Sequence, residues 1–381
     1  MKRFKKLAAG MVAAGMALAM LPVAAAQAAN MRTLTIETKV AGADSQDLQN
    51  MQIEYYVYMN RAIYGAGSVG FEAIPDGTTV AGSVFKDGLA RYTTTPDKKL
   101  VLPFTVADAD KYDYSVCMVQ PINVDVSPAE PGLSGCTQSL WFAGIGEGRM
   151  KTNLVWGKLD QDRTQTVTFS KRFRDVNAST PHLDDVDWLS YMGISMGWKE
   201  ADGTTTFRGM SPVVRQDMAA FLRREAVKRN ISDAASWKPS VADRKWFRDV
   251  TCTADNKGNM NTPHCEDILW LAHAGISEGW KEKDGSSTFR GMDTVKRQDM
   301  AAFLKRLAAK AGKGGDVKPK TDFTDVFAST PHRAEIQWLG GSGISEGYRN
   351  ANGTWRFEGM TSVYRQDMAA FIHRLDNLLA K

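Results

Sequence analysis

Histidine is scarce in this chain of 381 residues. Only five are present, and the first of them is His182. A catalytic histidine is therefore excluded from the region 31–170. Paired carboxylates there, such as Asp108 and Asp110, are more typical of a solvated turn than of an acid/base pair. A cell-wall hydrolase with its catalytic module in 31–170 is thus only an alternative, and we expect no enzyme activity.

Long apolar runs are rare as well. The one clear run, 7–26, follows Lys2, Arg3, Lys5 and Lys6 and ends at a small-residue cleavage site, Ala26-Gln27-Ala28, which predicts a secretory signal peptide over 1–29. Beyond it no run approaches 18 residues, and the C-terminal string LDNLLAK carries no sortase-type signal. We expect a secreted protein, held at the cell wall or cell surface by a folded part, with no transmembrane segment after signal cleavage.

An excess of positive charge is absent once the signal is set aside. When the four cations of the predicted signal peptide are subtracted from the 48 Lys and Arg of the chain, 44 remain, against 43 Asp and Glu. Nucleic-acid binding needs clustered positive charge, so that class of function has no support. No motif in the chain calls for a cofactor.

Cysteines number four, which in an exported chain favours two disulfides. Cys117 and Cys136 lie in one region, and Cys252 and Cys265 lie 13 residues apart in another. Local pairing within each region is the prediction, and free thiols remain the alternative. The second pair encloses a polar insertion, which a disulfide would stabilise by about 3 kcal/mol in the chain-entropy model.

Alternating apolar residues characterise the region 30–170. The pattern predicts strands at 34–38, 51–59, 90–94, 100–106, 112–119 and 165–169, separated by turns such as Pro75-Asp76-Gly77. Short strands of this kind favour an all-β sandwich. Their order resembles the immunoglobulin-like or prealbumin-like modules of bacterial surface proteins. Lys39, on an early strand, is a candidate for an intramolecular isopeptide bond.

The string RQDMAAF occurs three times without change, at 215–221, 297–303 and 365–371. A longer frame recurs around it: Phe-x-Asp-Val, Thr-Pro-His, Trp-Leu, Gly-Ile-Ser-x-Gly and Phe-x-Gly-Met. Each copy has a core of about 50–60 residues, the size of a unit that buries its apolar face only against a neighbour. We expect three repeats, 171–228, 245–310 and 321–379. The linkers near 226–245 and 308–322 permit closure within one chain or exchange between chains.

Each repeat predicts a helix, a loop and a second helix. Thr-Pro pairs at 180–181, 262–263 and 330–331 predict an N-cap followed by proline at the first helical position. Gly193, Gly275 and Gly343 predict the end of the first helix, and Asp-Gly or Asn-Gly turns follow. The second helix carries RQDMAAF, with Met218, Phe221 and Leu222 facing the core and Arg215, Asp217 and Arg224 off that stripe.

This frame resembles the S-layer homology repeat, in a divergent actinobacterial version. The resemblance covers about Phe173 to Leu379. In that family three repeats form a trefoil-like bundle that grips anionic secondary polymers of the Gram-positive cell wall through grooves between repeats. The resemblance therefore implies a multidomain protein, with an α-helical three-repeat bundle after the β-sandwich, anchored without a covalent bond to anionic cell-wall polysaccharide or a peptidoglycan-linked polymer.

The family's functional positions fall on three matching sets of residues. Its arginine corresponds to Arg215, Arg297 and Arg365, and its acid to Asp217, Asp299 and Asp367. The family's alanine between them is replaced by Gln216, Gln298 and Gln366. A guanidinium near a helix N-terminus makes a bidentate anion site, to which the helix amides add positive potential. The glutamine can donate to sugar hydroxyls.

Aromatic residues stand in the loop after the first helix of each repeat, at Trp198, Trp280 and Tyr348. They could stack on a sugar face. The alternative is that the arginines pair with the aspartate two residues on or with a neighbouring repeat, and that the aromatics pack between repeats. An adhesin whose repeats bind protein also stays open.

Three histidines are equivalent under the repeat: His182, His264 and His332. They could meet on a pseudo-threefold axis and bind a metal, but a packing role at the helix entry is favoured, because no cysteine or carboxylate stands at ligand spacing. We therefore predict no metal site.

Overall fold

The computed structural model describes residues 31–380 except 66–67, 106–107, 120, 127–149, 256–257, 259, 316 and 318–321. The predicted signal peptide lies outside the described residues. The chain divides into two compact units, Met1–Arg172 and Phe173–Lys381. Within the described ranges no helix is long and apolar enough to cross a membrane.

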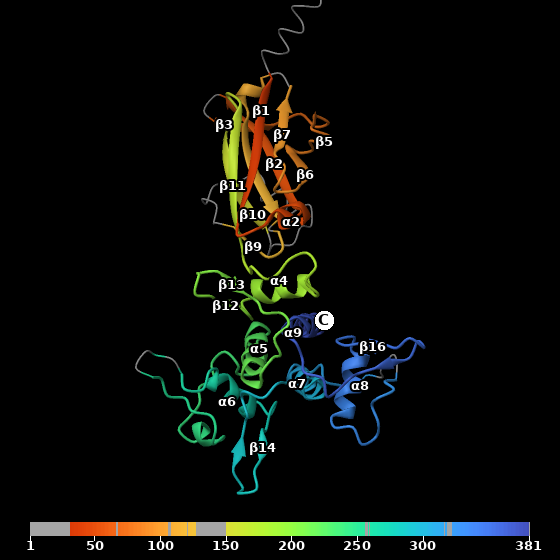
Figure 1. Ribbon diagram of the computed structural model, residues 1–381. Helices are drawn as coiled ribbons and strands as arrows, with labels where there is room; N and C mark the ends of the chain where they lie inside the picture. Colours follow the sequence, from red (N-terminus) through yellow and green to blue (C-terminus); the bar gives the residue numbers. More distant parts are fainter. Residues whose placement is uncertain are drawn as a thin grey trace, which may run out of the picture. The chain divides into compact units, whose positions relative to one another are not determined.

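Two sheets build the N-terminal unit (Figure 1). The first has the order β7 (Leu100–Phe104), β1 (Arg32–Ala41), β11 (Arg163–Lys171) and β9 (Val124–Val126). The second has the order β10 (Met150–Lys158), β8 (Asp113–Val119), β2 (Ile53–Gly65) and β3 (Ser68–Ala73), with β6 (Leu89–Thr94) also paired to β2. A short helix, α2 (Ser45–Asn50), a 3-10 turn (Ala109–Lys111) and a small hairpin of β4 (Thr79–Val80) and β5 (Ser83–Val84) complete the unit.

The core of this unit follows the alternation seen in the sequence. Leu34 and Ile36 of β1 share one buried cluster with Tyr55, Val57 and Met59 of β2. The prediction of a β-rich region is confirmed. One feature escaped the sequence pattern: β1 pairs in parallel with β11, so the beginning and end of the unit lie side by side (Figure 1).

Two predictions concern single residues of this unit. Cys117 is disulfide-bonded, and its predicted partner Cys136 lies outside the described residues. Lys39 is exposed on β1. The side chain of Lys171, by contrast, is buried, and its ammonium lies 2.6 Å from a carboxylate oxygen of Asp47.

Each repeat of the C-terminal unit is a helix, a two-stranded hairpin and a second helix. The first repeat has α4 (Leu183–Tyr191), β12 (Trp198–Lys199), β13 (Thr205–Thr206) and α5 (Arg215–Lys228). The second has α6 (Cys265–His273), β14 (Trp280–Lys281), β15 (Ser287–Thr288) and α7 (Arg297–Lys310), preceded by a 3-10 turn at Asp243–Lys245. The third has α8 (Arg333–Gly341), β16 (Tyr348–Arg349), β17 (Trp355–Arg356) and α9 (Arg365–Leu379).

The start of the first helix differs from the prediction. The helices begin two residues after proline, and the N-cap residues are His182, His264 and His332, in a left-handed conformation with φ of 58°, 59° and 58°. The threonine hydroxyl instead closes the preceding turn, as where Thr180 accepts from the amide of Asn177 at 3.0 Å. The Thr N-cap prediction is therefore wrong, because the turn takes the hydroxyl before the helix begins.

The three repeats close into a ring within one chain. The Val213 amide donates to the Val363 carbonyl at 2.8 Å, Val363 donates to Val295 at 2.9 Å, and Val295 donates to Val213 at 2.9 Å. The second helices α5, α7 and α9 contact one another at the centre, and each packs on the first helix of the next repeat: α5 on α6, α7 on α8, α9 on α4. The closing contact, α9 on α4, joins the last repeat to the first.

Candidate functional site

The predicted residues gather at three joints between repeats. At each joint the arginine of one repeat contacts an aromatic ring of the next. We name a joint after the repeat that supplies the ring: joint 1 combines Arg365 with Trp198, joint 2 Arg215 with Trp280, and joint 3 Arg297 with Tyr348. The guanidinium carbon lies 3.9, 4.0 and 4.8 Å from the ring centroid, respectively, within cation–π range.

Each of these guanidinium groups ties two repeats together. The Nε atoms of Arg215, Arg297 and Arg365 donate to backbone carbonyls of the next repeat at 2.9 Å, namely those of Phe289, Phe357 and Phe207. Nη2 donates to the serine of the Gly-Ile-Ser motif, Ser277, Ser345 or Ser195. The arginines are 4–5% exposed. The prediction that Arg215 lies off the buried stripe is therefore wrong: Arg215 precedes Met218 by three residues and Leu222 by seven, on the same face of the helix, and the neighbouring repeat covers that face.

Burial also sets the charge properties of the joints. It lowers the pKa of Arg215 and of Arg365 to about 10 and lowers that of Arg297. These groups stay charged at neutral pH. The aspartate two residues on does not neutralise them: Arg365 Nη1 lies 4.0 Å from Oδ2 of Asp217, which belongs to the next repeat. Of the alternatives for the arginines, packing against the neighbouring repeat is the one observed.

At the N-termini of the second helices, the backbone amides already donate hydrogen bonds to carbonyls of the next repeat. The amide of Arg215 donates to the Asp293 carbonyl at 3.0 Å and that of Gln216 to the Gly291 carbonyl at 2.9 Å. The same two bonds recur at α7 and α9. The glutamines are 8–9% exposed. The expectation that these amides add to an anion site is therefore wrong, since a loop of the next repeat already accepts their hydrogen bonds.

Aspartate and histidine form the more open part of each joint. Nε2 of His264, His332 and His182 lies 4.0, 3.8 and 3.7 Å from Oδ1 of Asp217, Asp299 and Asp367, respectively. The three histidines thus lie at three separate joints, each beside an aspartate of another repeat, rather than together on the axis. Burial raises the pKa of Asp367, although His182 and Arg297 oppose that shift.

A cavity of about 460 Å³ opens at joint 3. Of the predicted residues, Arg297, Tyr348 and Asp367 line it, and they come from two repeats. His182 of the first repeat lines it as well, so all three repeats contribute. Ser345, Glu346, Trp355 and Arg374 are among the other lining residues. The volume falls within the range of small-ligand sites.

The sequence interpretation missed several of these residues. The sequence gives the histidines a packing or metal role and gives the serines of Gly-Ile-Ser no role. Arg224, Arg306 and Arg374 donate to the carbonyls of Ile194, Ile276 and Ile344 in their own repeats. A signal was available, because all three kinds of residue recur at fixed places in the frame.

Comparison with known proteins identifies no family. No family model and no curated protein matches the chain. Three solved structures of the pilus-presented adhesin Spy0125 (Cpa), one of them a mutant, match 37% of this chain at 13–15% identity, with TM-scores of 0.18, 0.19 and 0.21. The match spans 26–27% of those chains. A likeness with such TM-scores carries no argument about fold or function.

Proposed function

We propose that the C-terminal unit binds an anionic polysaccharide of the Gram-positive cell wall and thereby fastens an exported protein to the cell surface, where the N-terminal unit is displayed. The observation that carries this proposal is the make-up of the joints. Each brings an arginine, an aromatic ring, an aspartate and a histidine together from three repeats, and at joint 3 they line a cavity.

The chemistry suits an acidic sugar polymer. Guanidinium groups bind carboxylate or phosphate bidentately, and aromatic rings pack on the apolar face of a sugar. The buried arginines are already engaged with backbone, so we assign the acidic group of the ligand to the less buried Arg224, Arg306 and Arg374, one in each repeat. Each has one nitrogen bonded to its own repeat, which fixes its position.

Cosedimentation with purified cell walls of the producing bacterium tests the proposal. The protein used is the chain without residues 1–29. Arg224, Arg306 and Arg374 are changed together to Gln, and we expect at least a tenfold loss of retention. Treating the walls with protease before the assay should leave retention of the wild type unchanged.

The matched control changes Lys199, Lys281 and Arg349 to Gln. These exposed cations follow the aromatic residues by one position on the hairpin strands, so they face the opposite side, and their loss removes the same charge. Equal retention of the two triple variants would contradict the proposal. Loss of binding to protease-treated walls would favour a protein ligand.

A further inference from the structure

The third repeat departs from the other two at the joint itself. Its hairpin has Tyr348 where the others have Trp198 and Trp280. It has Trp355 where they have Thr205 and Ser287. The charged residues also differ: Glu358 stands where the first repeat has Arg208, Asn350 where it has Glu200, and Arg356 where it has Thr206.

These changes alter which guanidinium groups lie over the aromatic ring of each joint. At joint 1 a second guanidinium, that of Arg208, lies 4.8 Å from the Trp198 centroid, and at joint 2 Arg290 lies 4.7 Å from that of Trp280. Glu200 and Glu282 hold these arginines at 3.0 Å. Each tryptophan therefore has two guanidinium groups within 5 Å of its ring.

Joint 3 leaves its ring more open. Arg356 is held by Glu358 at 2.6 Å and by Asn350 at 2.7 Å, and it lies 5.5 Å from the Tyr348 centroid. Arg297 is also farther from its ring than its counterparts are, at 4.8 Å. Tyr348 is exposed, at 38%, whereas Trp198 and Trp280 are half-buried. A ring in this state can accept a further contact.

The cavity beside Tyr348 has the groups that such a contact needs. Trp355 supplies a second aromatic surface, and Arg374 supplies a cation. Glu346 and Asp367 supply carboxylates that can accept from sugar hydroxyls. The combination of two aromatic side chains with charges of both signs suits a sugar ring that carries an acidic group.

We infer that joint 3 alone takes the ligand, one acidic sugar residue per chain, and that joints 1 and 2 are closed structural ties. This inference rests on the proposed function, which treats the three joints alike. It assigns recognition of the sugar to Tyr348 and Trp355 and recognition of its acidic group to Arg374.

Single variants distinguish this inference from the proposed function. Arg224→Gln, Arg306→Gln and Arg374→Gln are compared with the triple variant by cosedimentation with the purified walls. We expect Arg374→Gln to lose as much retention as the triple variant and the other two to stay within twofold of the wild type. Equal losses from all three single variants would overturn the inference and leave the proposed function standing. Full retention by the triple variant would overturn both.

A second variant, Trp355→Thr, gives the third hairpin the residue of the first. That hairpin folds with threonine at this place in the first repeat, so the change preserves the backbone. We expect at least a tenfold weaker affinity for polysaccharide released from the walls by dilute acid, with the melting temperature checked on the same sample. Calorimetry on the wild type should give one site per chain; three sites, or unchanged affinity in a folded Trp355→Thr protein, would refute the inference.

Discussion

Glu225 of α5 faces Asp376 of α9 at the contact between the first and last repeats, which no linker joins. Glu225 is fully buried, and neither of its carboxyl oxygens accepts a hydrogen bond. Burial is the main cause that raises the pKa of Glu225 to about 8. The negative charge of Asp376 and a hydrogen bond with that carboxylate raise it further. Asp376 stays ionised: although burial opposes it, hydrogen bonds from Arg229 and Lys228 hold its pKa below the ordinary value. The ring thus closes on a neutral acid beside a carboxylate.

This pair makes stability depend on pH in a defined direction. Because the folded-state pKa of Glu225 is raised, its contribution is fully present below the unfolded value near 4.5 and is lost as pH rises through about 8. Glu225→Gln keeps the shape and removes the titration. We expect this variant to be more stable than the wild type at pH 9, by on the order of a few kcal/mol, and close to it at pH 5.

Urea unfolding at the two pH values measures the effect. Glu200→Gln, at a partly exposed position of the same repeat where hydrogen bonds from Thr206 and Arg208 lower the pKa, is the control; its effect on stability should be the same at both pH values. If Glu225→Gln lowers stability equally at both pH values, Glu225 is not a neutral acid in the folded protein.

The second prediction concerns the hydrogen bonds by which a buried arginine joins two repeats, and their contribution to the free energy of unfolding. Arg365→Lys keeps the charge but loses the fork that bonds the Phe207 carbonyl at 2.9 Å and the Ser195 hydroxyl at 2.9 Å. We expect a loss of about 2–3 kcal/mol in unfolding free energy, because buried partners are left unpaired. The exposed Arg349→Lys should change stability by less than about 0.5 kcal/mol. Comparable losses in the two variants would show that Arg365 holds no tie.

The repeats made much of the C-terminal unit predictable. The three copies of RQDMAAF and the frame around them predict the order helix, loop, helix, and the Asp-Gly turns and the buried stripe of Met218, Phe221 and Leu222 follow from local rules. The partners of Arg215 were not predictable in this way. Arg215 precedes Met218 by three residues and Leu222 by seven, so helical spacing places it on the buried face. Only the closure of the ring shows that its guanidinium bonds the Phe289 carbonyl of the next repeat.

The same limit applied elsewhere. A left-handed His182 at the helix start has no local signature that outweighs Thr180-Pro181. The parallel pairing of β1 with β11 joins residues more than a hundred positions apart, and alternation alone does not reveal strand partners. Local patterns therefore gave the elements, while the contents of the joints came from contacts between repeats.

The glycine at the end of the Gly-Ile-Ser-x-Gly motif is a position where we expect a side chain to reduce stability strongly. Gly197 has φ of 71°, and a Cβ there would lie 2.4 Å from the Thr206 carbonyl oxygen and 2.7 Å from the Phe173 ring. Gly197→Ala combines a strained backbone with a clash against backbone, so we expect a loss above about 2 kcal/mol. Gly203→Ala is the matched control, because φ is 83° there but nothing lies within 4 Å of the added carbon. It should cost about 1 kcal/mol, and equal melting temperatures for the two variants would contradict the clash.

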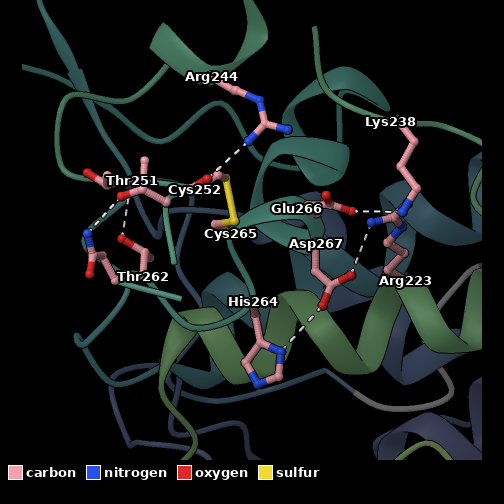
Figure 2. Close-up of a disulfide and its surroundings, with 12 residues drawn as sticks. Arg223, Lys238, Arg244, Thr251, Cys252, Thr262, His264, Cys265, Glu266 and Asp267 are labelled. Atoms are coloured by element: carbon pink, nitrogen blue, oxygen red, sulfur yellow. Dashed lines mark hydrogen bonds and ion pairs between the residues drawn. A yellow bond between two sulfur atoms is a disulfide. The ribbon is translucent and has the colours of Figure 1, made fainter. Parts of the chain in front are cut away.

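The Cys252–Cys265 disulfide, which confirms one predicted pair, gives the last prediction (Figure 2). Cys265 is the first residue of α6 and follows His264, whose Nδ1 lies 3.4 Å from Oδ2 of Asp267; Arg223 lies 3.2 Å from the other oxygen. The bond therefore holds the insertion of the second repeat against a helix start that contributes to joint 1.

Changing both cysteines to alanine frees a loop of 13 residues. We expect about 3 kcal/mol less stability in the C-terminal unit, a fall in melting temperature of about 6–12 °C, because the unfolded chain regains the entropy that the bond removed. Scanning calorimetry of the double variant measures it, with the transition of the N-terminal unit in the same scan as the internal control. An unchanged C-terminal transition would mean that contacts around His264 and Asp267 hold the insertion without the bond, whereas a fall in both transitions would mean that the two units do not unfold independently.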